Sequence, residues 1–89
     1  MTDFDSVNRL LYESLNELRG KLIEKDYINA KVNIDVGEPG LALETICSQL
    51  YEYNIHIPKR IYDLLARAGQ MMNMSEDLWK MLLPIVDRT

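Results

Sequence analysis

The chain holds one cysteine, Cys47, and one histidine, His56, the residue types that form a thiol nucleophile and its general base. Cys47 falls on the apolar side of a predicted helix, where an unpaired cysteine usually packs as a small hydrophobic side chain. His56 lies between Ile55 and Ile57 in a short predicted loop. The sequence therefore favours structural roles for both residues, and we expect no nucleophilic catalysis.

Two pairs of carboxylates, Asp35/Glu38 and Glu44/Glu52, have the residue types needed for general acid–base catalysis. Neither pair has a neighbouring His or Lys, or an evident apolar pocket, to shift a pKa towards neutrality. The sequence therefore predicts a protein that is not an enzyme.

Metal and phosphate sites have no sequence support either. One Cys and one His cannot supply a four-ligand zinc site, and no DxDxDG spacing for calcium occurs. The segment 35–40 contains two glycines but lacks the glycine-rich patterns that bind phosphates. We expect no metal and no cofactor.

The net charge of the protein is concentrated in one segment. Residues 32–58 contain no Lys or Arg. They contain four acids, Asp35, Glu38, Glu44 and Glu52, whose summed charge equals the formal net charge of the whole chain, −4. An acidic balance argues against binding nucleic acid, which needs clustered Lys and Arg, but suits a basic protein partner. Mild acidity that merely aids solubility is the simpler explanation.

No apolar run approaches the length of a membrane span, and no basic region precedes an apolar stretch at the N-terminus. These features predict a cytoplasmic protein that does not bind membranes.

The candidate residues must be positioned by helices. A first helix is predicted from a cap at Thr2–Asp3 to about Gly20, because apolar residues recur at steps of three and four. This apolar stripe consists of Phe4, Val7, Leu11, Leu15, Leu18 and Leu22.

Residues 24–36 fit two patterns. Ala30, Val32, Ile34 and Val36 alternate as in a strand, whereas Ile23, Tyr27, Ala30 and Ile34 fit helical spacing. We favour a helix, because the sequence offers no second strand to satisfy the backbone groups of a lone one. Gly37 then suits the left-handed position that closes a helix.

The segment Glu38-Pro39-Gly40 predicts the start of a central helix, since proline is favoured in a first turn. This helix should end near Asn54. Its apolar side comprises Ala42, Leu43, Ile46, Cys47, Leu50 and Tyr53. Its polar side comprises Glu44, Thr45, Ser48 and Glu52, with Tyr51 at the border.

Two more helices are predicted, one beginning at Ile57-Pro58 and one capped by Ser75 and kinked or stopped by Pro84. Met71, Met72, Met74 and Met81 fall in apolar stripes, for which core packing is the default role. The sequence predicts an all-α fold: a compact single-domain bundle of about five short helices over residues 1–89.

The candidate functional site is a protein-binding face. It comprises Asp35, Glu38, Glu44, Ser48, Tyr51 and Glu52. Tyrosine is enriched at binding hot spots, and clustered charge speeds encounter with an oppositely charged partner. A solvated helix face beside a capping acid explains the same residues equally well.

The stretch from Val36 to Tyr53, with Ile57-Pro58 and the run Met71-Met72-Asn73-Met74 before Trp79, resembles the MafI family of immunity proteins. The likeness covers about residues 26–80 and is strongest at Gly37-Glu38-x-Gly40-Leu-Ala-Leu-Glu44 and Leu50-Tyr-Glu52. Such proteins accompany bacterial contact-dependent growth-inhibition and related polymorphic toxins. The resemblance implies a cytoplasmic, non-enzymatic inhibitor that binds a cognate toxin domain, often a nuclease.

These lines of reasoning meet at the acidic face. A ribonuclease presents a basic cleft to phosphates, and an acidic face can occlude that active site in a 1:1 complex. The sequence also allows binding beside the active site. A different class of function is a small helical adaptor that holds a partner helix in a Met- and Leu-rich groove.

Overall fold

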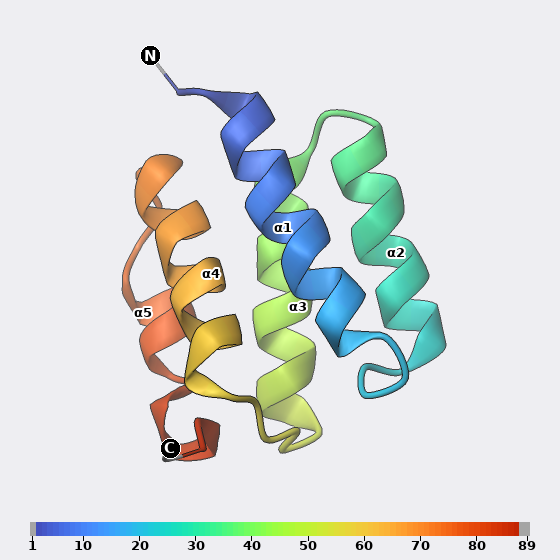
Figure 1. Ribbon diagram of the computed structural model, residues 1–89, viewed down its shortest axis with the longest axis vertical. Helices are drawn as coiled ribbons and strands as arrows, with labels where there is room; N and C mark the ends of the chain where they lie inside the picture. The colour runs from blue at the N-terminus through green and yellow to red at the C-terminus, as the bar shows by residue number, and fades with distance from the viewer. Residues whose placement is uncertain (1, 88–89) are drawn as a thin grey trace.

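The computed structural model describes residues 2–87 and confirms the predicted all-α fold (Figure 1). Its five α-helices within this range are α1 (Phe4–Leu18), α2 (Glu24–Asp35), α3 (Pro39–Glu52), α4 (Lys59–Met71) and α5 (Asp77–Lys80), followed by a 3₁₀ turn at Leu83–Ile85. The ambiguous segment is therefore helical, as favoured. Within residues 2–87 no helix is both long and apolar enough to cross a membrane.

Helix α3 lies at the centre of the bundle and contacts each of the other four α-helices. In Figure 1, α1 crosses in front of α3, α2 lies to its right, and α4 and α5 lie to its left. The most extensive helix pairs are α2 with α3 and α1 with α4. The core is formed by large side chains from all five helices and the following segments, including Leu11, Leu15, Leu18, Ile34, Leu43, Ile46, Leu50, Ile61, Leu65, Trp79 and Leu82.

Helices α2, α3 and α4 end with the same backbone geometry. After α2, α3 and α4 the chain reverses through a residue with positive φ, namely Gly37 (82°), Asn54 (51°) and Asn73 (57°). At each, two backbone N–H groups bond back to the last turn, as in Ile55 N to Leu50 O at 2.9 Å. This pairing satisfies carbonyls that the helix end would leave free. Short, defined turns therefore set the direction of the next helix.

Helix starts are less uniform. Asp3 caps α1 by accepting from the Ser6 N–H at 3.2 Å, as the sequence predicted. Pro39 occupies the first turn of α3, again as predicted. Pro58 instead precedes α4 as its cap residue in an extended conformation.

Two aromatic residues expected on buried stripes are exposed. Phe4 and Tyr53 each expose 53% of their surface. Both lie at a helix end, Phe4 at the first residue of α1 and Tyr53 just after α3, where the bundle no longer covers the stripe. Their place in an apolar pattern therefore does not make them core residues.

A close fit between α4 and α5 was not visible in the sequence. Gly69 is buried on α4, and a Cβ placed there would overlap the ring of Trp79. Trp79 is itself 2% exposed and among the largest fully buried side chains. Gly69 therefore makes room for the indole, and does not simply weaken the end of α4.

Gly69→Ala should destabilise the protein by roughly 1–3 kcal/mol, because an added methyl in a packed site forces side chains and backbone to shift. Gly40→Ala is the matched control, since its Cβ would meet Met74 at an ordinary 3.9 Å. That control should be neutral or gain up to about 1 kcal/mol, from helix propensity. Urea unfolding measures both; equal stability of the two variants would contradict the packing role.

Candidate functional site: an acidic protein-binding surface

The outer side of α3 carries four of the six residues predicted to bind a partner. Glu44, Ser48, Tyr51 and Glu52 are all exposed, with Tyr51 showing 56% of its surface. They lie on one side because the opposite side of α3 packs into the core, and spacings of three, four and seven residues repeat the same helical face. We call these four residues the α3 acidic face.

A shallow depression runs between this face and α2. It is lined by Asn33, Leu41, Glu44, Thr45, Ser48 and Gln49. The two helices are held together nearby by Gln49, whose Nε2 donates to the buried carboxylate of Asp26 at 2.8 Å. A shallow, mixed polar surface of this kind suits a protein partner better than a small ligand, which needs an enclosed apolar cavity.

Asp35 lies apart from the α3 acidic face. Its carboxylate accepts a hydrogen bond from the Tyr12 hydroxyl of α1, and it lines a groove together with Arg19, Tyr27 and Lys31. The Asp35 carboxylate raises the pKa of Tyr12, because a phenol that donates to a carboxylate resists ionisation. The structure thus places Asp35 on the α1 side of α2, with one acceptor site already in use.

Glu38 lies in the turn between α2 and α3 and is exposed. It precedes Pro39 at the start of α3, but its side chain makes no capping hydrogen bond. Its charge remains near the positive end of the α3 dipole, which stabilises it there. Glu38 is therefore available to a partner at the end of the depression nearest the turn.

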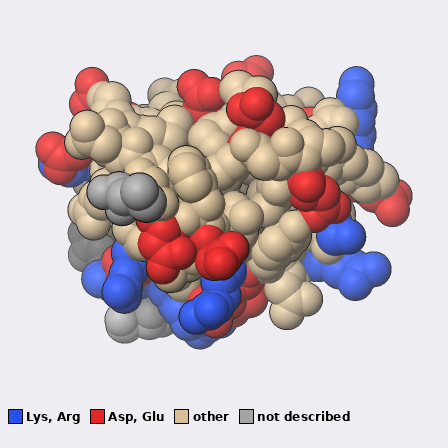
Figure 2. Space-filling model, turned by 90° about the horizontal axis from the view of Figure 1, so that it is seen from above, with Lys and Arg blue, Asp and Glu red and all other residues tan. Residues whose placement is uncertain are grey.

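The charge distribution is uneven in space as well as in sequence. Figure 2 views the molecule from the end where the N-terminus lies; Lys and Arg gather mainly in the lower half of the picture, and the upper half carries mostly Asp and Glu. Outside residues 32–58, several Lys and Arg side chains form ion pairs with acids. Examples are Lys59–Asp63 (2.9 Å), Lys80–Glu76 (3.0 Å) and Arg60–Glu17. None of the ion pairs among residues 2–87 involves Glu38, Glu44 or Glu52.

Sequence reasoning missed the apolar part of this surface. Leu41 is half exposed beside Glu44, and Ile28, Val32 and Val36 are exposed along the outer side of α2. Their four-residue spacing was the available signal. That signal is weak, because the inner residues of the same helix, Ala30 and Ile34, are apolar as well.

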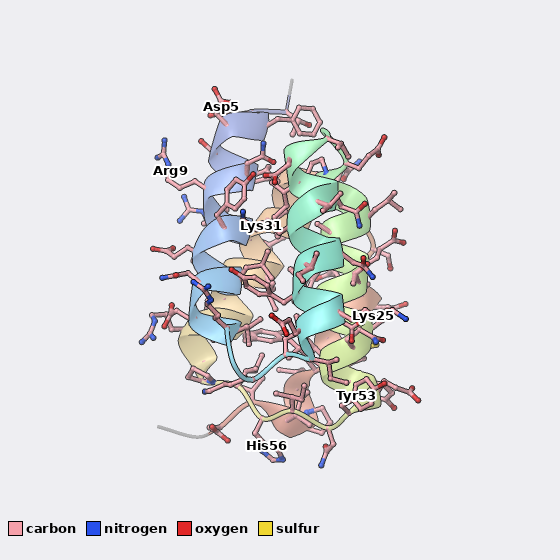
Figure 3. The ribbon with its side chains drawn as sticks, turned by 90° about the vertical axis from the view of Figure 1, so that its right-hand side faces the viewer. Asp5, Arg9, Lys25, Lys31, Tyr53 and His56 are labelled. Carbon is pink, nitrogen blue, oxygen red and sulfur yellow. The ribbon has the colours of Figure 1, made fainter. Side chains whose placement is uncertain are left out.

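The pair Cys47 and His56 is not assembled as a catalytic site. Cys47 is fully buried, and burial raises its pKa to about 12. His56 is exposed at the foot of the bundle in Figure 3, where its Nδ1 lies 3.3 Å from the carboxylate of Asp87. A buried neutral thiol and a solvated imidazole have separate structural surroundings and no shared site.

The methionines have the packing role expected of them. Met71, Met72, Met74 and Met81 are partly buried and pack against the core. Across the described range, 2–87, no three His, Cys, Asp or Glu side chains cluster in a way that would hold a metal ion.

Comparisons with protein-family models, with curated proteins and with solved structures find no match. The resemblance to MafI immunity proteins therefore stays a prediction from the sequence.

The burial of Cys47 gives a direct test of the α3 assignment. A thiol reagent at pH 8 should modify native Cys47 at least about 100-fold more slowly than the unfolded chain, because labelling must wait for opening of the core. Cys47→Ala/Ser48→Cys moves the thiol by one residue onto the α3 acidic face, where it should react at nearly the unfolded rate. Comparable rates for the two proteins would show that the faces of α3 are misassigned.

The same thiol should make stability depend on pH in the alkaline range. Its folded pKa is raised above the ordinary value of 9.0, so the folded state holds the proton more tightly. The contribution of the neutral thiol to the free energy of unfolding is fully present below pH 9 and is lost as pH rises towards 12. Urea unfolding between pH 8 and 10.5 should therefore show a smaller loss of stability in Cys47→Ala than in the native chain; an equal loss would contradict this linkage.

Proposed function

We propose that this protein is an immunity protein that binds a cognate toxin domain and neutralises it by covering its active site. A basic ribonuclease is the expected class of toxin, and a 1:1 complex the expected assembly. The single observation that carries the proposal is the α3 acidic face, which is exposed and belongs to a segment without any Lys or Arg. The resemblance to MafI proteins supplies the class of partner.

The physical argument rests on complementarity of charge. A nuclease must attract phosphates, so its cleft is basic. Unpaired carboxylates on a rigid helix produce a field that steers such a cleft towards it and raises the rate of association. Tyr51 adds a semi-rigid aromatic side chain beside Glu44 and Glu52, and tyrosine is often an energetic hot spot.

The size of a specific interface requires more than these four side chains. A typical complex covers roughly 800 Å² on each partner. Helix α3 has 14 residues, so its outer face is only about 21 Å long. The exposed Leu41 and the turn at Glu38 extend the surface at one end, and Tyr53 extends it at the other. Leu41 and the tyrosines then provide apolar contact within an acidic rim.

The alternative, an adaptor with a methionine-rich groove, receives less support. The four described methionines pack against the core, and Leu41 is the one apolar residue among the six that line the depression beside α3. An exposed apolar groove that accepts a helix would need the opposite arrangement.

The proposal is tested by capture of the toxin domain encoded immediately upstream. The two purified proteins should form a stoichiometric complex at micromolar concentration, and the toxin's ribonuclease activity should be lost on mixing. Absence of a complex at micromolar concentration would overturn the proposed function.

Glu44→Lys/Glu52→Lys tests the acidic face separately. This double variant should slow association by at least about tenfold and reduce its dependence on salt, since exposed charges act mainly on the encounter rate. Glu13→Lys/Glu76→Lys is the control, because it makes the same change in net charge at exposed positions outside residues 32–58. Stopped-flow mixing at several salt concentrations measures both; equal effects of the two double variants would rule out a specific role for α3.

A further inference from the structure

Helix α2 is apolar on its outer side as well as its inner side. Ala30 and Ile34 are buried against the bundle, whereas Ile28 and Val32 expose 50% and Val36 exposes 66% of their surfaces. An exposed row of apolar side chains on a helix is a candidate surface for contact with another protein. We call Ile28, Val32 and Val36 the outer strip.

The outer strip is accessible along its whole length. Helix α2 forms the right-hand edge of the molecule in Figure 1 and lies at the front in Figure 3. Residues four apart form one ridge on a helix, and Val32 stands midway, about 6 Å along the axis from Ile28 and from Val36. The strip is therefore symmetric in length and in character about Val32.

The charges beside the strip are opposite at its two ends. Lys25 lies near the Ile28 end, at the lower end of α2 in Figure 3, and Glu38 lies beyond the Val36 end, in the turn to α3. Along the edge that faces α1, Lys31 lies close to the middle and Asp35 towards the Val36 end. The other charged residues that line this edge are Glu24 and, just after α1, Arg19. Neither Lys25 nor Lys31 forms an ion pair within residues 2–87.

We propose that the outer strip binds a second copy of this chain, with the two α2 helices antiparallel about a two-fold axis at Val32. Ile28 then packs against Val36 of the second copy, and Val32 packs against Val32. On one edge Lys25 approaches Glu38 of the second copy, and on the other Lys31 approaches Asp35 of the second copy. The Val32 contact lies on the axis and occurs once, and each of the other contacts occurs twice, as two-fold symmetry requires.

The observations favour a second copy over a different protein because the strip is complementary to itself. Reversing its direction places apolar residues on apolar residues and both lysines near acids of the second copy. An unrelated partner would need no such symmetry. This inference does not depend on the proposed function. The α3 acidic face stays outside the contact, and Glu38 is a residue that the two proposed surfaces share.

The interface is small, so the dimer should be weak. One pair of short helices covers less than the roughly 800 Å² per partner of a standard interface, and a dissociation constant on the order of 10–100 μM is expected. Sedimentation of the full chain from about 10 μM to 1 mM should therefore show a monomer–dimer equilibrium. A protein that remains monomeric at 1 mM would overturn the proposal.

Cysteine crosslinking tests the register. Val32→Cys should give a covalent dimer under mild oxidation, because the two thiols face each other at the axis. Ile28→Cys alone and Val36→Cys alone should not crosslink, since each is about 12 Å from its own symmetry mate along the axis. A mixture of the two should crosslink. Cys47 is buried and contributes no background. Failure of Val32→Cys to crosslink, or equal crosslinking of Ile28→Cys alone, would contradict this arrangement.

Exchanging the charges of Lys25 and Glu38 tests whether these residues meet at the ends of the outer strip. Lys25→Glu and Glu38→Lys should each weaken the dimer severalfold, and the double variant should restore it, because the pair is re-formed with its signs reversed. These positions are exposed, so circular dichroism should show unchanged folding. Additive weakening in the double variant would show that these two residues do not meet. Capture of the toxin domain by monomeric Val32→Lys would separate this proposal from the proposed function.

Discussion

Burial of the inner side of α3 is the constraint on which the other helices depend. Ala42, Leu43, Ile46, Cys47 and Leu50 are all fully buried, and they are covered from different directions by α1, α2, α4 and α5. A helix enclosed in this way has only one side left for solvent. The exposure of Glu44, Ser48, Tyr51 and Glu52 therefore follows from core packing, and the carboxylates are held on a rigid support.

Much of this arrangement could be predicted because it depends on local signals. Gly37 and Pro39 mark a helix end and a helix start, and the three- and four-residue spacing of apolar residues gives the buried sides. Asn54 and Asn73 adopt the same left-handed conformation as Gly37, yet asparagine is compatible with many conformations and gives a weaker signal. The Gly69–Trp79 contact was not predictable, because it joins two helices whose relative position only the tertiary packing sets.

The candidate site shows the same division between local and non-local information. The side of α3 that carries Glu44 and Glu52 could be read from a helical wheel. The direction of Asp35 could not, because it is set by Tyr12, a residue of another helix. The outer strip of α2 was missed for a different reason: an apolar residue in sequence does not reveal whether it meets the core or solvent. Only the packed structure shows that Ile28, Val32 and Val36 stay at least half exposed.

The two surfaces lie on adjacent helices, and their geometry decides whether they compete. Pairing through α2 engages Asp35 and Glu38 near the second copy's lysines, and it leaves the four residues of the α3 acidic face free. The second copy's lysines would then partly neutralise Asp35 and Glu38. Of the four acids in residues 32–58, only Glu44 and Glu52 on α3 would stay unpaired. A two-fold axis at Val32 would also duplicate that face, one on each copy. Such a dimer would present two separate sites for the proposed basic partner, so each chain would still bind one toxin domain and the proposed 1:1 ratio would be kept.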